Sequence, residues 1–387
     1  MTELPLPTGD QDRAQTQVGV LLVALLVVVV VVVAQTQYAP AERAETEAEH
    51  SVALLEDMKE LQVSTLQAAQ SGATQSVPVE LGSQYSSFLI LSQPANYPWG
   101  TIETTNETEI GVLNAEAVRD DTRDYLDGSP LIFNTAGLRY SPEYLQRDEP
   151  ATELRNGILA QGDGTMLTGS NLVDGQQINI IAVDGNVSEA GQRAAIMVAD
   201  PLSSSDQTVP VESANGDPIE IRLQTQLSEE KWRQALSEEI DPDCSAIQEP
   251  YVCGVSVEDN VATITLAPGP TYQLNTALVG YRTVESAGGA GKTPEAEYLV
   301  RTDTQLVGQN EVEVTVEARD KFSNPVQGAV IEADARSGRL SEREVRTDAS
   351  GEATFRVSTG ASSTNRVELT IEGVDGEQAT VTFEITG

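Results

Sequence analysis

The chain has 387 residues, and 60 acidic against 23 basic residues give it a formal net charge of −37. This length is sufficient for two or three domains. The sequence has no basic patch that could neutralise phosphates, so the composition argues against nucleic acid as a partner. Aromatic residues make up only 4% of the chain. Any core must therefore consist mainly of Val, Ile, Leu and Ala.

The acidic residues are dispersed along the chain, and lysines are scarce. This combination resembles the surfaces of proteins from extreme halophiles, on which carboxylates hold hydrated cations. Near 1 M salt the Debye length is about 3 Å, so repulsion between the carboxylates is screened. In dilute buffer the same charge destabilises the compact state. The composition therefore indicates a halophile, and an acidic surface protein of a mesophile is the alternative.

A run of seventeen apolar residues extends from Val18 to Ala34. At about 1.5 Å per residue it gives roughly 26 Å of helix, slightly short of a bilayer core of about 30 Å. No small-x-small cleavage site follows the run, which favours an uncleaved anchor over a signal peptide. We expect a short leader or cytoplasmic segment at residues 1–16, a transmembrane helix at residues 17–35, and contact with the lipid bilayer through residues 18–34.

The leader ends in Asp12-Arg13-Ala14-Gln15, shortly before the apolar run. A short polar leader, a basic residue and a small residue before a hydrophobic helix resemble an archaeal type IV prepilin signal. The resemblance implies cleavage between Ala14 and Gln15 and self-association of the helix in a filament core. Gly19 stands at the fifth mature position, where bacterial pilins have glutamate.

Residues 36–71 are predicted to form an amphipathic stalk helix, because Leu54, Met58 and Leu61 follow the spacing i, i+4, i+7. This narrow apolar stripe fits two arrangements. The helix packs against the chain's own β domain, or it associates with other helices in a pilin-like bundle or a dimer. The lone histidine, His50, lies among glutamates and is predicted to be solvated.

The sequence offers no catalytic apparatus and no metal site. It contains no Gly-x-Ser-x-Gly nucleophile elbow, no HExxH, and no second histidine beside His50. Cys244 and Cys253 are predicted to close a small disulfide loop in an oxidising compartment, with free thiols as the alternative. Two thiolates without a nearby histidine fill only half of a tetrahedral zinc shell. We therefore expect no enzyme activity, no cofactor and no bound metal.

Residues 72–285 are predicted to form an extracellular β-rich domain. Short strand patterns bounded by Gly, Pro, Asn or Asp recur at residues 77–81, 88–91, 101–105, 177–183 and 219–223. A helical island at residues 228–236 begins with a Ser/Glu capping pattern and carries Trp232 on its core face. Asn106 and Asn186 head sequons and are candidate glycosylation sites.

Three segments of this domain resemble uncharacterised haloarchaeal membrane-anchored, pilin-like surface proteins. They are Gly82-Ser-Gln-Tyr85, Gly137-Leu-Arg-Tyr-Ser-Pro142 and Leu227-Ser-Glu-Glu-Lys-Trp232. With the leader and the helix, the likeness covers residues 10–260. It implies a surface protein and no particular reaction.

A Gly-rich linker is predicted at residues 286–307. Its Ser286-Ala-Gly-Gly-Ala-Gly-Lys292-Thr293 differs by one residue from a phosphate-binding loop, which needs Gly at the position of Ser286. The motif also needs a long helix after it, whereas Pro294 follows directly. An exposed interdomain linker accounts for the same residues.

The last segment, residues 308–387, has the pattern of an antiparallel β-sandwich. Apolar residues alternate with polar ones in six or seven short stretches. Its Asn324-Pro-Val-x-Gly-Ala329 and Thr347-Asp-x-x-Gly-x-Ala-x-Phe355 elements resemble the bacterial Ig-like domains of invasin and intimin type. The resemblance implies a rigid spacer or an adhesive tip, with turn-forming roles for Pro325, Gly328, Asp348 and Gly351.

We therefore predict a mainly β protein with one long N-terminal α-helix. It comprises a transmembrane and stalk helix, a β-sandwich-like middle domain and a C-terminal Ig-like β-sandwich. The predicted function is that of a non-enzymatic, single-pass membrane-anchored surface protein of a halophile. Its extracellular bulk would display the β-rich domain and an Ig-like spacer or adhesive module to a cell-surface or S-layer partner. The alternative is a type IV pilin-like or pseudopilin filament subunit processed after Ala14.

Overall fold

The computed structural model describes residues 11–85, 97–123, 125–204, 207–241, 243–244, 250–285, 289–308, 311–336, 339–358 and 364–386. Within these ranges the side chains of residues 11–19, 34–39, 303–308, 364 and 386 are not described. The strand predicted at residues 88–91 lies outside the described residues, as does residue 286, where the predicted linker begins.

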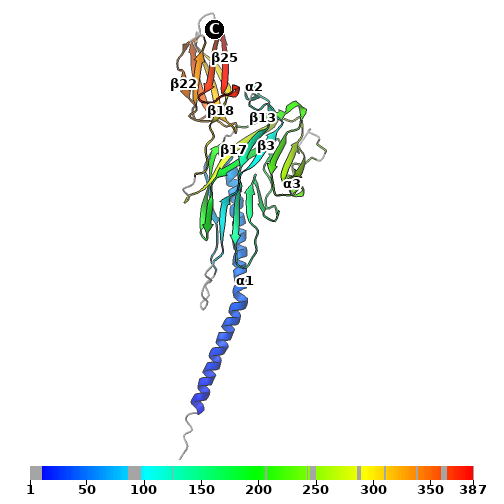
Figure 1. Cartoon of the computed structure of the whole chain (residues 1–387), viewed down its shortest axis with the longest axis vertical. Helices are drawn as coiled ribbons and strands as arrows, with labels where there is room; N and C mark the ends of the chain where they lie inside the picture. The colour runs from blue at the N-terminus through cyan, green and yellow to red at the C-terminus, as the bar shows by residue number, and fades with distance from the viewer. Residues whose placement is uncertain are drawn as a thin grey trace, which may run out of the picture.

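The described chain is mainly β, with a helix at its N-terminal end and an Ig-like sandwich at its C-terminal end (Figure 1). Its helical elements are α1 (Gln11–Ser71), α2 (Asp120–Arg123), α3 (Glu229–Ala235) and two short 3-10 helices, η1 (Ala214–Gly216) and η2 (Glu377–Ala379). Pro40 lies within α1.

Three sheets build the middle domain. Sheet A has the order β1 (Gln75–Glu80), β12 (Ala194–Ser203), β17 (Tyr272–Thr283), β10 (Gln177–Gly185) and β9 (Val173–Asp174). Off this path, β13 (Val209–Ser213) pairs with β17, and β4 (Ala115–Ala117) pairs with β13. Sheet B has the order β11 (Ser188–Gly191), β2 (Trp99–Thr104), β6 (Leu138–Glu143), β7 (Thr152–Arg155) and β8 (Ile158–Gln161). Sheet C has the order β15 (Val252–Glu258), β16 (Val261–Leu266), β14 (Glu220–Gln224), β3 (Thr108–Leu113) and β5 (Leu131–Thr135).

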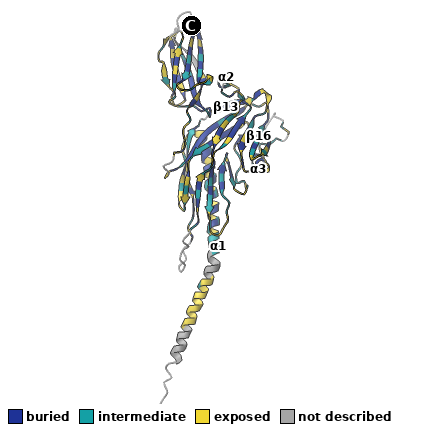
Figure 2. Cartoon of the chain, viewed as in Figure 1, coloured by how far each residue is buried: buried dark blue, intermediate teal, exposed yellow. Residues whose placement is uncertain are grey.

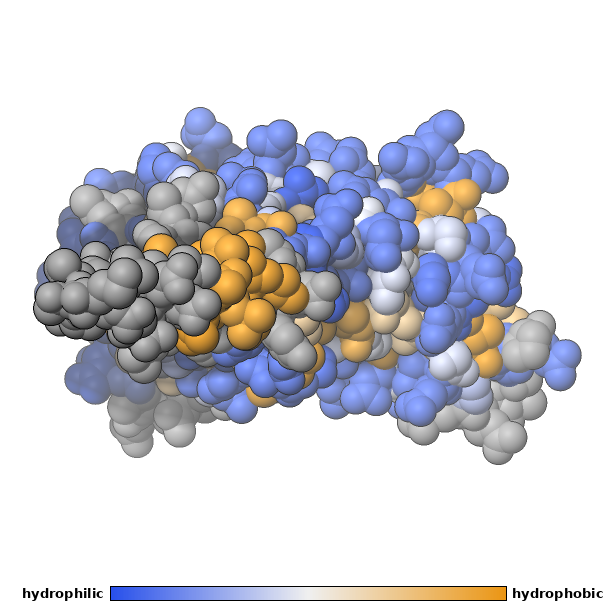
Figure 3. Space-filling view, turned by 90° about the horizontal axis from the view of Figure 1, so that it is seen from below, coloured by the Kyte–Doolittle hydropathy of each residue, from blue (hydrophilic) through white to orange (hydrophobic). Residues whose placement is uncertain are grey.

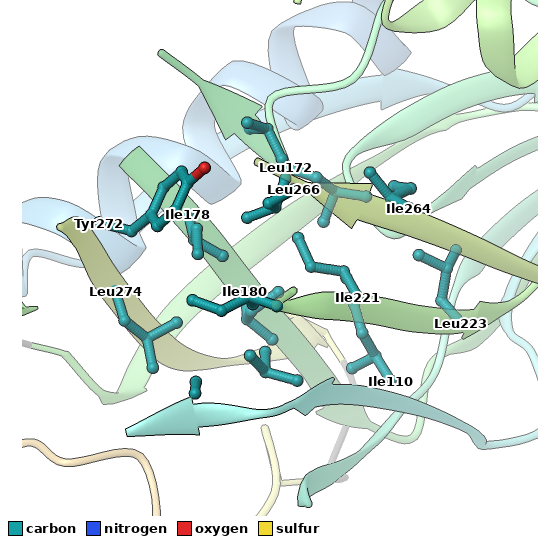
Figure 4. Packing of buried hydrophobic residues seen from close by; sticks show 14 of the residues in the cluster. Ile110, Leu172, Ile178, Ile180, Ile221, Leu223, Ile264, Leu266, Tyr272 and Leu274 are labelled. Carbon is teal, nitrogen blue, oxygen red and sulfur yellow. The ribbon is translucent and has the colours of Figure 1, made fainter. Parts of the chain in front are cut away.

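The core of the middle domain is built from β-branched and leucine side chains of sheets A and C, as the low aromatic content predicts. Figure 4 shows Ile178, Ile180 and Leu274 of sheet A lying towards Ile221 and Ile110 of sheet C. These side chains are 0–2% exposed. The predicted helical island is present as α3: the Ser228 side chain caps it by accepting a hydrogen bond from the Lys231 N–H. Trp232 of α3 belongs to the same core.

The second half of α1 is part of the middle domain. Leu54, Met58 and Leu61 are at most 3% exposed and share a core with Val79 of β1 and Met197 of β12. Their spacing places one stripe of the helix on sheet A, while the opposite side carries exposed residues such as Val52 and Val63. Of the two arrangements open for the stalk helix, packing on its own β domain accounts for this stripe.

Two four-stranded sheets form the C-terminal sandwich. Sheet D has the order β18 (Ala296–Gly308), β19 (Glu311–Asp320), β23 (Glu352–Ser358) and β21 (Arg339–Leu340). Sheet E has the order β22 (Glu344–Arg346), β20 (Val330–Ala335), β24 (Thr364–Ile371) and β25 (Thr380–Thr386). Alternating residues of facing strands fill the core between them, including Val314, Val316, Phe355, Leu369 and Phe383.

The predicted linker at residues 286–307 is wrong over most of its length. β18 begins at Ala296 and pairs with β19 over its whole length, from Ala296–Asp320 to Gly308–Glu311. The Ig-like sandwich therefore begins at its first strand, twelve residues before the predicted boundary at residue 308. The predicted linker was too long because it included Tyr298-Leu299-Val300, which is a buried segment of strand β18.

The Ig-like sandwich joins the middle domain through the turn that follows β19. Phe322 of this turn is 1% exposed and belongs to the core of the middle domain, where it stacks on Phe133 with ring centroids 4.6 Å apart. Asn324 donates hydrogen bonds from Nδ2 to Ser203 Oγ and to the Thr276 carbonyl, both 2.8 Å long.

A second aromatic pair reinforces the same joint. Tyr125 of the middle domain stacks on Tyr298 of β18, with centroids 4.0 Å apart and planes 8° from parallel. The Tyr125 hydroxyl also donates to the Lys321 carbonyl at 3.1 Å. The buried Phe322 ring, the stacked tyrosine pair and the buried hydrogen bonds of Asn324 together hold the two domains in one orientation.

We expect Phe322→Ala to loosen this joint. Removing a buried phenylalanine costs about 3–5 kcal/mol, here from contacts that join two domains. Small-angle X-ray scattering at high salt should show a broader interdomain distance distribution for this variant. Phe355→Ala is the matched control, because it removes the same side chain from the core of the Ig-like sandwich. Broadening in the control but not in Phe322→Ala would contradict the assignment.

Candidate functional site

The first half of α1 exposes an apolar surface that no other described part of the chain covers. Its large apolar side chains from Val20 to Val33, Val31 apart, are 48–69% exposed. Figure 1 shows this part of α1 projecting away from the β domains, Figure 2 shows it as exposed, and Figure 3 shows its hydrophobic atoms. Among the described residues, no helix combines the length and apolarity needed to cross a bilayer.

The predicted processing site lies near the beginning of this helix. Ala14 and Gln15 are within the backbone of α1, and their side chains are among those not described. The apolar segment and the packed segment thus belong to one helix, with Pro40 between them. Contiguous exposed apolar surfaces are typical of sites that contact lipid or other proteins.

A buried carboxylate fixes α1 to the β domain at the point where the helix leaves it. Glu47 is fully buried, and its Oε1 accepts hydrogen bonds from the Tyr85 hydroxyl at 2.5 Å and from the Leu145 N–H at 2.8 Å. Its Oε2 accepts from the Gln146 N–H at 3.0 Å. Burial and the bond to Glu47 raise the pKa of the Tyr85 hydroxyl. A charge is buried only where such partners compensate it.

His50 lies one turn further along α1, and the prediction that it is solvated is wrong. The residue is only 4% exposed. Nε2 lies 3.0 Å from the Glu80 carbonyl, to which it donates, so Nδ1 accepts from the Tyr144 hydroxyl at 2.6 Å. Burial lowers the pKa of His50, and burial also raises the pKa of nearby Asp57, which accepts from the Glu80 N–H.

The positions of Glu47 and His50 in the sequence indicate that both residues are buried, although their polar side chains suggest the opposite. Glu47 and His50 precede Leu54 by seven and four residues, so they lie on the same helical stripe as the apolar core. Their polarity suggested solvent exposure, whereas their position on the helix required burial. We refer to Glu47, His50 and their hydrogen-bond partners as the helix anchor cluster.

The structure brings the other predicted site residues together in two pairs, the cysteines and the sequon asparagines. Cys244 and Cys253 form a disulfide with Cα atoms 4.8 Å apart, which ties β15 to the segment before it. Asn106, between β2 and β3, and Asn186, between β10 and β11, are both exposed. These loops are neighbours, because the Thr104 N–H donates to the Val187 carbonyl at 3.0 Å.

The glycine-rich segment has no phosphate-binding geometry in its described part, residues 289–295. Strand β18 follows it, whereas a phosphate-binding loop continues into a helix. The described residues also contain no group of three or more potential metal-ligating side chains.

The turn residues of the C-terminal module occupy the positions that the sequence motifs indicate. Gly351 has a φ of +73°, and a Cβ there would lie 2.8 Å from the Pro325 Cβ and 2.9 Å from the Ala318 carbonyl oxygen. Asp348 Oδ1 accepts from the Ser350 N–H at 2.8 Å and from the Glu352 N–H at 3.0 Å. Glycine is required at residue 351 by both conformation and space.

Residues 301–384 match the bacterial Ig-like domain, group 1. This match covers the C-terminal module and less than a quarter of the chain. No curated protein matches the chain.

Several solved structures share weak similarity with the chain. The D0-D1 domain of intimin is 12% identical with a TM-score of 0.21, over 72% of this chain and 100% of that one. The D00-D0 domain of intimin is 9% identical with a TM-score of 0.21, over 56% and 96%. A Parabacteroides merdae β-glucuronidase is 12% identical with a TM-score of 0.20, over 54% of this chain, which spans 24% of the enzyme. Scores this low support no conclusion about activity.

The burial of His50 in the helix anchor cluster predicts that the stability of the fold depends on pH. The folded pKa of His50 lies below the ordinary value of 6.5, so the unfolded chain binds more protons as the pH falls through 6.5. Stability should therefore decrease from pH 7.5 to pH 5.5, with a slope of at most about 1.4 kcal/mol per pH unit for one proton. His50 is the only histidine in the chain.

Denaturant unfolding of the wild type and of His50→Gln at several pH values, in constant high salt, measures this slope. We expect the variant to show a smaller change in unfolding free energy over this range. Equal slopes for the two proteins would contradict a buried, neutral His50.

Proposed function

We propose that this protein is a non-enzymatic surface protein that α1 anchors in the cell membrane as a single pass, with its C-terminal bulk outside. One observation carries the proposal: the exposed apolar half of α1 and the Ig-like module lie at opposite ends of the molecule (Figure 1). A helix that is apolar on all sides requires an apolar environment. Lipid contacting residues 18–34 would provide it.

The structure between the two ends supports a role in display. The helix anchor cluster fixes the direction in which α1 leaves the middle domain, and the Phe322 joint fixes the Ig-like module. Both connections use buried side chains. Forces at the tip would therefore reach the membrane through a semi-rigid rod.

In this proposal the Ig-like module is the spacer or adhesive tip, and its partner is another cell-surface or S-layer component. The charge of −37 fits a surface exposed to the high salt of a halophile. The exposed sequons at Asn106 and Asn186 and the Cys244–Cys253 disulfide fit an extracellular location.

A type IV pilin-like or pseudopilin subunit is the second candidate. The observation that favours it is a single α1 that is apolar and exposed at its beginning and carries a β domain on its later turns. In a filament the apolar halves of several copies would cover one another. This role requires removal of the leader after Ala14.

Val27→Lys tests the contact with lipid. A lysine near the centre of a membrane helix costs about 2.5–3.5 kcal/mol on insertion scales. We expect the variant to leave the membrane fraction. Val52→Lys is the matched control, because Val52 is 63% exposed on the packed half of α1. A Val27→Lys protein that stays with membranes would contradict the anchor.

The mass of the protein purified from native membranes distinguishes the two candidates. A membrane anchor should begin at Met1 or Thr2, whereas a processed pilin-like subunit should begin at Gln15. Intact-mass spectrometry with N-terminal sequencing measures this directly. A chain that begins beyond Ala34 would contradict both, because the apolar segment would be lost.

A further inference from the structure

Sheets B and C of the middle domain enclose a polar groove that none of the roles above uses. It consists of two cavities of about 460 and 440 Å3, which share lining residues from β6, β7 and the segment between β14 and α3. Each volume is within the range of small-molecule sites. We call it the B–C groove, and its shared lining residues are Arg139, Arg155, Gln224, Thr225 and Gln226.

The wall of the groove is charged but balanced. Arg139 Nη2 donates to Glu153 Oε2 at 2.7 Å, and Arg155 donates to Glu153 Oε1 and to Thr108 Oγ1. We call the cavity of about 460 Å3 the inner cavity and the other the outer cavity. In the inner cavity, the negative charges of Glu153 and Asp163 offset the positive charges of the two arginines. The wall is therefore close to neutral, in a chain whose net charge is −37.

The inner cavity contains a buried acceptor without a partner. Asn156 is 6% exposed, its Nδ2 donates to the Gln224 carbonyl at 3.4 Å, and its Oδ1 accepts no hydrogen bond within the described chain. An unsatisfied buried acceptor costs about 1–3 kcal/mol. The side-chain amides of Gln224 and Gln226 also line the groove.

The turn between β7 and β8 accounts for an asparagine at residue 156, but not for its unpaired side-chain oxygen. Asn156 and Gly157 join β7 to β8 with φ values of 51° and 71°, the conformation of a type I′ turn. Asn-Gly is a preferred pair for this turn. The turn uses none of the hydrogen-bonding capacity of Asn156 Oδ1, which is the observation that points to a ligand.

From these features we infer that the B–C groove binds a neutral saccharide. Sugar hydroxyls donate and accept hydrogen bonds, which matches Asn156 Oδ1 and the two glutamine amides. Ile158, Leu227 and Trp232 line the inner cavity but are at most 8% exposed, so contacts with a ligand would be mainly polar. The balanced wall favours an uncharged ligand over an anion.

The ligand has two potential sources. Asn106 lines the outer cavity, so a glycan attached there could fold into the groove. A saccharide from another cell-surface molecule could enter the same groove. The full-length chain carrying Asn106→Gln removes the first source and is the background for the binding measurements.

The test uses saturation-transfer NMR with cellotriose, maltotriose, mannotriose and chitotriose, and trigalacturonate as the charged comparator. We expect at least one neutral trisaccharide to bind the Asn106→Gln chain. Adding Asn156→Gly should weaken that binding about tenfold, since it removes one hydrogen-bonding partner. Asn215→Gly is the matched control, because Asn215 is exposed, has a φ of 54° and lies outside the groove.

Unchanged binding on Asn156→Gly, no binding of any neutral trisaccharide, or stronger binding of trigalacturonate would overturn the inference. Equal denaturation midpoints for the two glycine variants show that folding is preserved. Weaker binding to the glycosylated wild type than to Asn106→Gln identifies the attached glycan as the occupant. Equal binding identifies an external saccharide. Both results support the groove as a saccharide site.

Discussion

The burial of one stripe of α1 on sheet A is the interaction on which the rest of the architecture depends. The same helix must be apolar on all sides in its first half and amphipathic in its second half. Leu54, Met58 and Leu61 complete the core beneath β1 and β12. Without this packing, the exposed apolar segment would have no fixed direction relative to the β domains. The exposed apolar segment and the middle domain are therefore connected through one packed helix.

Polar groups fix the rotation and position of α1 more closely than its apolar stripe does. Glu47 accepts hydrogen bonds from two backbone N–H groups of the loop after β6, and His50 bridges Glu80 and Tyr144. Apolar contacts alone tolerate rotation and sliding of a helix, whereas hydrogen bonds to buried groups are directional. At the other end of the molecule, Asn324 has the same role beside the buried Phe322 ring. In both places a buried polar group lies at the boundary of an apolar core.

The sequence was sufficient for the features that depend on local periodicity or on short motifs. The apolar stripe of α1, the Ser228 cap of α3 and the turns around Gly351 are where their spacing places them. The burial of His50 was missed because its chemical character outweighed its position on the helix. The first strand of the Ig-like sandwich was missed because a glycine-rich segment directly precedes it, and the predicted linker was continued into the strand.

Other features depend on contacts between residues far apart in the chain, which periodicity does not reveal. Phe322 belongs by sequence to a turn of the Ig-like module, yet it fills the core of the preceding domain. The B–C groove brings Asn106, Asn156 and Gln224 together from sheets B and C. Such sites follow from the packing of the sheets. In a chain with so few aromatic residues, the buried rings at the joint mark an important contact between the two domains.

The charge distribution explains how this fold can be stable in concentrated salt. Most of the ion pairs found among the described residues are partly exposed, and such pairs contribute little and are screened by salt. The pair of Arg319 and Glu317 is an exception, because its side chains are 9% and 6% exposed and it lies beside the joint. Burial of apolar surface does not weaken when salt screens charges. High salt should therefore remove the repulsion among the carboxylates while leaving the cores and the joint intact.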